Sequence, residues 1–141
     1  MTGGQEHPGT GRNLMGQEAP SLDFARLAEA LGVELVLKLP AEDLSSLEAG
    51  LKQALAQEGL SVVIVEGPCV LQYRVRGDVF GVDGEICAGC GMCLRLGCPA
   101  LVAEEHDDRQ WPRVDETLCT GCGLCAQVCP KKALAPVSSR R

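Results

Sequence analysis

The stretch that decides the fold is Cys87-Ala88-Gly89-Cys90-Gly91-Met92-Cys93, which is followed after four residues by Cys98-Pro99. It is repeated as Cys119-Thr120-Gly121-Cys122-Gly123-Leu124-Cys125, which is followed after three residues by Cys129-Pro130. Eight of the nine cysteines fall in these two runs. In each run, three cysteines therefore stand three residues apart, and a fourth cysteine stands immediately before a proline.

This spacing is typical of thiolate ligation of a 4Fe-4S cluster in bacterial electron-transfer proteins. Each of the four irons needs one thiolate, and a tight loop rich in glycine can reach three of them without crowding the cluster. In proteins with two such clusters, the fourth cysteine of each run ligates the other cluster. The predicted ligand sets are Cys87, Cys90, Cys93 and Cys129 for one cluster, and Cys119, Cys122, Cys125 and Cys98 for the other.

Zinc ions or disulfides are the alternative uses of these thiols. Zinc sites usually combine separated Cys-x-x-Cys pairs, whereas here each triplet has a trailing Cys-Pro. Disulfides are disfavoured because the N-terminal residues do not follow the basic-then-apolar pattern of a signal peptide. The spacing therefore favours iron–sulfur clusters.

The repeat extends beyond the cysteines. Segment 82–87 aligns with segment 114–119 at a constant offset of 32 residues. We expect each half to contain a short entering strand, a cluster loop and a short helix that begins near the Cys-Pro, as in a dicluster ferredoxin. The first half has one extra residue before Cys98, which should bulge that turn but leave the thiol within reach.

The composition limits the possible partners and surroundings. A net charge of −6 and a pI near 4.9 argue against nucleic acid and favour a partner with a basic docking patch. No apolar run approaches a membrane span, and thiols that hold iron must stay reduced, which indicates the cytoplasm. The acidic segment 104–108, which includes His106, is predicted to be an exposed connecting loop. Cys69, outside both runs, is predicted to be a buried, unreactive thiol.

The residues before the cysteine runs have an α/β pattern. Residues 1–20 are rich in Gly, Pro and polar residues and are predicted to be irregular. Apolar periodicity predicts a helix over 22–31, a strand over 33–39, a helix from about 41 to 59, and a continuously apolar strand over 60–65. The predicted fold class is therefore α/β followed by α+β, with domains at 1–69 and 70–141.

Two parallel strands with two helices cannot cover their own apolar faces, and they leave both sheet edges open. We therefore expect the region 1–69 to be the end of a larger α/β domain, with Met1 either an internal methionine or the start of a truncated gene. An independent four-element domain docked on the cluster domain is the alternative.

The chain resembles the C-terminal part of the large (alpha) subunit of indolepyruvate ferredoxin oxidoreductase, a thiamine diphosphate-dependent 2-oxoacid:ferredoxin oxidoreductase. The resemblance covers nearly the whole chain. It rests on Met1-Thr2-Gly3-Gly4-Gln5-Glu6-His7-Pro8-Gly9-Thr10-Gly11, on Val62-Val63-Ile64-Val65-Glu66-Gly67-Pro68-Cys69, and on the two cysteine runs in this order. The four-residue spacing before Cys98-Pro99 is also similar to this family.

The resemblance implies that Thr2, Gly3, Gln5 and His7 border a thiamine diphosphate site without being sufficient to bind the cofactor. The acidic-Asn motif that holds Mg²⁺ in the family is absent here, as is the second thiamine-binding domain. In the complete enzyme, an aryl-pyruvate would be oxidatively decarboxylated and its acyl group passed to coenzyme A. The clusters would carry the electrons away one at a time.

The implied partners are the remainder of the alpha subunit, a beta (small) subunit and an external ferredoxin, with no nucleic acid and no membrane. No catalytic residue is assigned to this chain, which by itself should only transfer electrons. The alternative function is a free-standing dicluster ferredoxin-like carrier with an N-terminal docking module. A zinc-stabilised scaffold is a third hypothesis. Colour distinguishes it from the other two, because iron–sulfur protein is brown and zinc protein is not.

Overall fold

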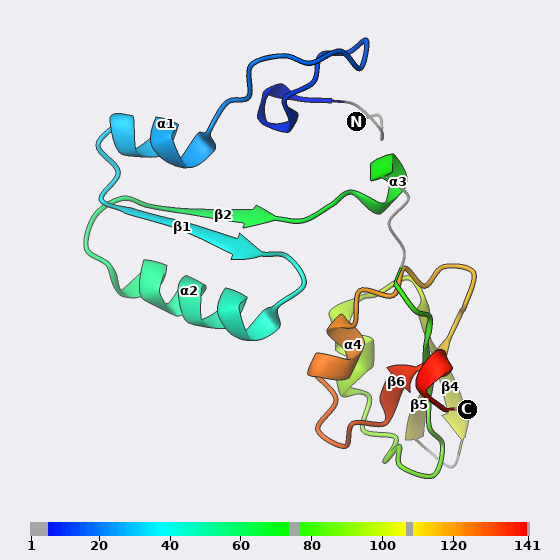
Figure 1. Ribbon diagram of the computed structural model, residues 1–141. Helices are drawn as coiled ribbons and strands as arrows, with labels where there is room; N and C mark the ends of the chain where they lie inside the picture. Colours follow the sequence, from blue (N-terminus) through cyan, green and yellow to red (C-terminus); the bar gives the residue numbers. More distant parts are fainter. Residues whose placement is uncertain (1–5, 74–76, 107–108, 141) are drawn as a thin grey trace. The chain divides into compact units, whose positions relative to one another are not determined.

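The computed structural model describes residues 6–73, 77–106 and 109–140. The chain divides into two compact units, Met1–Arg74 and Val75–Arg141 (Figure 1). The division follows a short helix, α3 (Val70–Tyr73), whereas the sequence-based boundary at 69/70 precedes it. No described helix is long and apolar enough to cross a membrane.

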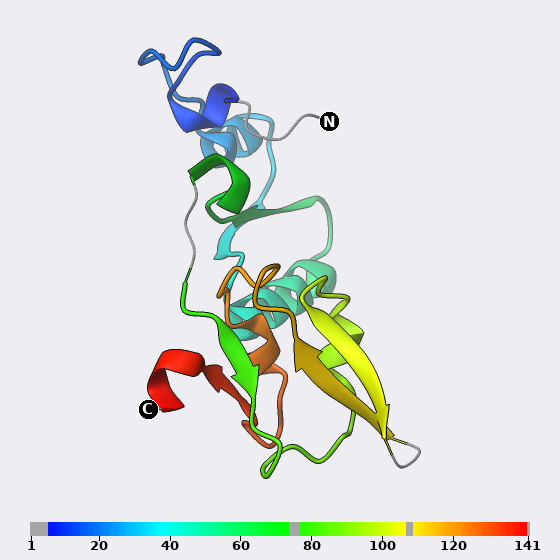
Figure 2. The same cartoon turned by 90° about the vertical axis from the view of Figure 1, so that its right-hand side faces the viewer.

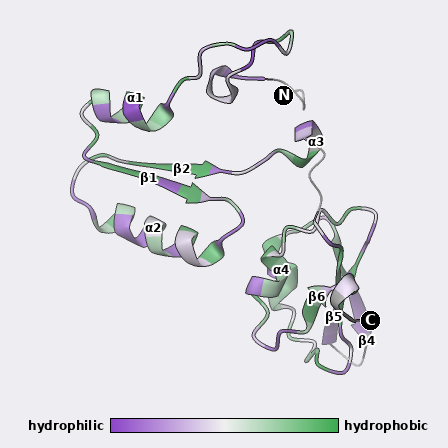
Figure 3. Ribbon diagram, viewed as in Figure 1, coloured by the Kyte–Doolittle hydropathy of each residue, from purple (hydrophilic) through white to green (hydrophobic). Residues whose placement is uncertain are grey.

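The first unit alternates helix and strand as the sequence predicts. Its elements are α1 (Phe24–Ala30), β1 (Leu35–Pro40), α2 (Leu44–Ala56) and β2 (Ser61–Glu66). The two strands pair in parallel, from Leu35 opposite Ser61 to Pro40 opposite Glu66. Both strands are mainly hydrophobic (Figure 3), which is typical of parallel strands covered on both faces.

Aspartates at the N-caps start both helices. The Asp23 carboxylate accepts hydrogen bonds from the backbone N–H groups of Ala25 and Arg26, and it begins α1. Asp43 likewise accepts from Ser45 and Ser46 and begins α2. Each cap satisfies N–H groups that have no partner within the helix. The helices therefore begin two or more residues later than the hydrophobic periodicity alone predicts.

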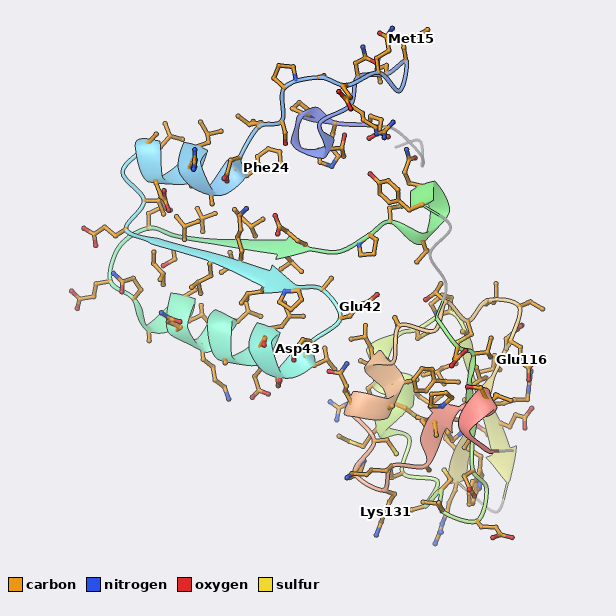
Figure 4. The ribbon with its side chains drawn as sticks, viewed as in Figure 1. Met15, Phe24, Glu42, Asp43, Glu116 and Lys131 are labelled. Carbon is orange, nitrogen blue, oxygen red and sulfur yellow. The ribbon has the colours of Figure 1, made fainter. Side chains whose placement is uncertain are left out.

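The two helices lie on opposite faces of the sheet. Lys38 of β1 points toward α1, because its Nζ lies 3.6 Å from the Asp23 carboxylate. Leu39, the next residue, points toward α2, where its side chain packs against Gly50. Neighbouring residues of a strand face opposite sides of the sheet. Figure 4 shows Phe24 at the start of α1 on one side and Asp43 at the start of α2 on the other.

The segment ahead of α1 is more ordered than its composition predicts. The 3-10 turn η1 (Pro8–Thr10) is capped by His7, whose Nδ1 accepts a hydrogen bond from Gly9 N–H at 3.1 Å. A β-bridge joins Arg12 to Glu18 further along. Side-chain caps and a proline at the first helical position explain a turn in a sequence without apolar periodicity.

The second unit consists of two antiparallel strand pairs with short helical turns between them (Figure 2). Strand β3 (Phe80–Val82) pairs with β6 (Leu134–Pro136), so the first and last strands of the unit lie together. Strands β4 (Leu101–His106) and β5 (Arg109–Val114) form a hairpin. The turns are η2 (Met92–Leu96), α4 (Leu124–Gln127) and η3 (Val137–Arg140).

Three predictions about local structure are wrong. The helices do not begin near the Cys-Pro: η2 and α4 end before Cys98 and Cys129, since each turn begins directly after a left-handed glycine. The residues up to His106 form strand β4 rather than a loop, because Leu101 to His106 pair with Val114 to Arg109. Asp107 and Asp108 lie outside the described residues. Cys69 is exposed rather than buried.

Candidate metal centre

Cysteines from both runs line one cavity of the second unit. The run that follows β3 contributes Cys87, Cys90 and Cys93, and Cys129 comes from beyond α4. Ala133 and Leu134, both buried, close the cavity on the side of β6. The structure thus brings together four thiols that stand up to 42 residues apart in the sequence.

The other four cysteines line a second cavity. Its lining includes the following thiols: Cys98, Cys119, Cys122 and Cys125. The cavity has a volume of about 320 Å³, and apart from the thiols it is mainly apolar, with Phe80 and Leu101 in its wall. The first cavity is much smaller, at about 10 Å³.

Left-handed glycines turn the backbone between the thiols. Gly89, Gly91, Gly121 and Gly123 have φ values between 62° and 76°, where L-residues with a side chain are disfavoured. Gly121 also lies against the backbone of Gly77, so a Cβ atom there would collide with it. The glycines therefore allow both the turn and the close approach of neighbouring backbone.

Two backbone N–H groups point at thiol sulfurs. Gly89 N lies 3.5 Å from Cys87 Sγ, and Ala133 N lies 3.3 Å from Cys129 Sγ. Hydrogen bonds to cluster sulfurs raise the reduction potential by stabilising the more negative, reduced state. Both donors lie at the first cavity, where the peptide around Gly89 is further covered by Trp111 of β5.

The thiols of each cavity are electrostatically coupled. Burial first, and then negative charge at Cys122 and Cys119, raises the pKa of Cys125 to about 11. Burial likewise raises the pKa of Cys93, with a further contribution from charge at Cys129 and Cys87. Four thiolates cannot share such a space unless a cationic group compensates their charge. The donor set therefore fits a group of metal ions bound by sulfur.

Among the described residues, no group of three or more His, Cys, Asp or Glu side chains is placed to hold one metal ion.

The residues that the resemblance places at the thiamine site are only partly described. Thr2, Gly3 and Gln5 lie outside the described residues. His7 lines a cavity of about 650 Å³ in the first unit, at the carboxyl end of β2, together with Lys38 and Glu66. No sequence motif marks Lys38 as a site residue, because only the folded chain brings this residue of the predicted strand to the same cavity as His7 and Glu66.

Among the described residues that line this cavity, Lys38 is the one lysine or arginine, and it is already paired. Its Nζ lies 3.6 Å from a carboxylate oxygen of Asp23 and 3.6 Å from one of Glu66. Nearby, Gln72 donates a hydrogen bond to Glu6 Oε1 at 3.1 Å, whereas Glu6 Oε2 is buried without a hydrogen-bond partner within the described structure. An unsatisfied buried carboxylate oxygen is costly.

Comparison with known protein families matches both units. A model of the thiamine pyrophosphate enzyme, C-terminal TPP binding domain, matches residues 1–65, and a model of the 4Fe-4S binding domain matches residues 112–135. The second match overlaps the run that begins at Cys119, so this chain contains a 4Fe-4S binding segment.

Curated relatives cover the chain from end to end. Indolepyruvate oxidoreductase subunit IorA of Methanothermobacter thermautotrophicus is 40% identical over 96% of this chain and 22% of its own length. The proteins of the same name from Thermococcus kodakarensis and Archaeoglobus fulgidus are 37% and 31% identical over 97% and 99% of this chain. The chain thus spans about a fifth of the length of these relatives. It belongs to the family of the indolepyruvate oxidoreductase alpha subunit, IorA, and corresponds to a C-terminal part of that subunit.

Proposed function

We propose that this chain relays electrons through two 4Fe-4S clusters, as part of an enzyme that oxidises indolepyruvate or related aryl-pyruvates. The observation that carries the proposal is the pair of cavities, each lined by four cysteines drawn from both runs. Bound clusters would accept and pass on single electrons. The names of the relatives support the class of substrate.

The ligand sets that we propose are those of the two cavities. Cys87, Cys90, Cys93 and Cys129 would hold the first cluster, and Cys119, Cys122, Cys125 and Cys98 the second. In each site, three thiolates come from one turn and the fourth from the other half of the unit. Loss of a fourth cysteine should therefore damage the cluster opposite its own run.

We further propose that residues 70–141 form a dicluster ferredoxin-type domain. The repeat in the sequence supports this, because both halves enter their cluster loop in the same way. The carboxylates of Asp83 and Asp115, at equivalent positions, each accept a hydrogen bond from the backbone N–H two residues later. The same Asx turn thus leads into Cys87 and into Cys119.

Residues 1–69 are proposed to form the C-terminal portion of a thiamine diphosphate-binding domain. Thr2, Gly3, Gln5 and His7 would border the cofactor, which together with Mg²⁺ would be bound only in the complete enzyme. Hard cations such as Mg²⁺ need several well-placed oxygen ligands, and the cavity beside His7 offers carboxylates that already pair with Lys38.

The proposed partners are the remainder of the alpha subunit, a beta subunit and an external ferredoxin, in the cytoplasm. A net charge of −6 favours docking on a basic patch of the partner. Electron transfer to such a partner should therefore slow as the salt concentration rises.

Anaerobic reconstitution tests the proposal. Two cubanes require about eight irons and eight sulfides per chain, and the protein should be brown and reducible by dithionite. The Cys69→Ala variant is the matched control, because it removes an exposed thiol that lies outside both cavities. Binding of two zinc ions without sulfide would contradict the proposal.

A further inference from the structure

The two halves of the second unit differ directly after the fourth cysteine of each run. In one half, Cys98-Pro99 leads straight into Ala100-Leu101. In the other half, Lys131-Lys132 stands between Cys129-Pro130 and Ala133-Leu134. We call these two residues the lysine insertion, because they have no counterpart in the other half of the repeat.

The structure supports this alignment, because the alanines that follow occupy equivalent places. The carbonyl oxygen of Ala100 accepts a hydrogen bond from Asp115 N–H at 2.8 Å. The carbonyl oxygen of Ala133 accepts one from Asp83 N–H, also at 2.8 Å. Both alanines are 2% exposed. The lysine insertion therefore lengthens the turn of one half only.

The backbone of the lysine insertion adopts an unfavourable conformation. Lys132 has a φ of 56°, and in the described part of the chain it is the one residue other than glycine with a positive φ. This left-handed region is costly for a residue with a long side chain, and such strain is concentrated at functional sites. The next residue, Ala133, places its N–H 3.3 Å from Cys129 Sγ.

The insertion also brings a positive charge to the first cavity. Lys131 is exposed and lines this cavity together with Cys129 (Figure 4). Among the described residues that line the first cavity, it is the one lysine, arginine, aspartate or glutamate. The described lining of the second cavity contains no residue of these four types. The two cavities therefore differ in their charge.

This difference acts on the reduction potentials of bound clusters in a definite direction. A reduced cluster carries one more negative charge than an oxidised one, so a nearby cation stabilises the reduced state more. The N–H groups of Gly89 and Ala133, which point at sulfurs of the first cavity, act in the same direction. An apolar, uncharged wall such as that of the second cavity disfavours the added charge.

We propose that the lysine insertion gives the first site a higher reduction potential than the second, and that the charge of Lys131 sets much of this difference. The inference rests on the proposed function, because it concerns clusters bound in the two cavities. A single electron delivered to the chain then resides mainly at the site of Cys87, Cys90, Cys93 and Cys129. Lys131 acts through its field and is not a ligand.

Potentiometric titration of the reconstituted 141-residue chain, followed by electron paramagnetic resonance, tests the proposal. Cys98→Ala isolates the signal of the first site and Cys129→Ala that of the second, because each removes one ligand of the other cluster. We expect the first site to bind an electron at least about threefold more tightly than the second. This factor corresponds to about 30 mV, at about 59 mV per tenfold for one electron.

Substitutions of Lys131 test the cause of the difference. In the Cys98→Ala background, Lys131→Gln should weaken electron binding at the first site by about threefold to tenfold, which is about 30–60 mV. Lys131→Glu should weaken it further, and Lys131→Arg should restore the original potential because it keeps the charge. The matched control is Lys52→Gln, which removes an exposed lysine of the first unit and changes the net charge equally.

Three results would overturn the proposal: a higher potential at the second site, no response of the first site to Lys131→Gln, or an equal response to Lys52→Gln. Iron content shows that each variant is loaded, since about four irons per chain should remain in the Cys98→Ala background. A missing shift in a loaded variant therefore counts against the role of Lys131. A chain without Cys substitutions that takes up no iron and sulfide would instead contradict the proposed function, and this inference with it.

Discussion

Cys98 stands immediately after the glycine that ends η2, and it lines the cavity of the other cysteine run. We predict that Cys98→Ala damages the cluster held by Cys119, Cys122 and Cys125, which should lower the iron content from about eight to about four per chain. Electron paramagnetic resonance of the reduced protein checks which cluster signal is lost. Selective loss of the signal from the Cys87 site would show that the ligand pairing is wrong.

Position 121 requires glycine for two separate reasons. Its φ of 76° disfavours any side chain, and a Cβ atom would collide with the backbone of Gly77. We predict that Gly121→Ala lowers the free energy of unfolding by at least about 1–2 kcal/mol, the cost of the left-handed conformation alone. It should also weaken retention of the cluster at Cys119.

Gly84→Ala is the matched control for this substitution, because Gly84 has no positive φ and open space around its Cα. Thermal unfolding and iron retention are measured for both variants. Equal melting temperatures would contradict the role assigned to Gly121.

At the scale of the elements, α2 depends on the ionised carboxylate that begins it. Hydrogen bonds from the hydroxyls of Ser45 and Ser46, followed by the backbone N–H of Ser46, lower the pKa of Asp43 to about 2 from its ordinary value of 3.8. A lowered pKa in the folded state contributes stability above the unfolded-state pKa, and this contribution is lost as the pH falls.

We therefore predict that the first unit loses stability between about pH 4 and pH 2, in part through protonation of Asp43. Asp43→Asn keeps a capping oxygen but cannot titrate, so it should flatten this part of the pH profile. Chemical denaturation at a series of pH values checks the difference between the two proteins. Identical pH profiles would show that the cap does not titrate in this range.

The elements also show where local sequence patterns fail. Apolar periodicity predicted α1, β1, α2 and β2, because buried apolar residues recur at different sequence intervals in helices and in strands. It did not predict the β4–β5 hairpin, whose strands contain Glu104, Trp111 and Arg113 rather than an apolar run. The hairpin is stabilised by pairs of side chains on its two strands, such as the 2.6 Å ion pair of Arg113 with Glu104. The residue pattern of either strand alone does not reveal such pairs.

At the scale of the whole molecule, residues 1–65 match only the C-terminal TPP binding domain of thiamine pyrophosphate enzymes. We predict that the 141-residue chain neither binds thiamine diphosphate tightly nor decarboxylates a 2-oxoacid. Among the described residues that line the cavity of the first unit, Lys38 is the one lysine or arginine, and it is engaged by Asp23 and Glu66; these described residues also offer no set of free oxygens for Mg²⁺. Calorimetry with thiamine diphosphate and Mg²⁺ is the test, and micromolar binding would refute the prediction.

The sequence by itself determined the chemistry of the second unit, because cysteine identity and spacing within seven residues specify which metal group a turn can hold. It also indicated the alternation of helix and strand in the first unit, since burial periodicity is a local property. The sequence pattern also predicted that Cys129 joins Cys87 and that Cys98 joins Cys119. Only the tertiary structure brings each pair to one cavity, because these residues lie tens of positions apart in the chain. It alone also placed α1 and α2 on opposite faces of the sheet, through Lys38 and Leu39. The sequence pattern shows that a strand is apolar, but the side of the sheet on which its neighbours lie is set by the path of the chain in three dimensions.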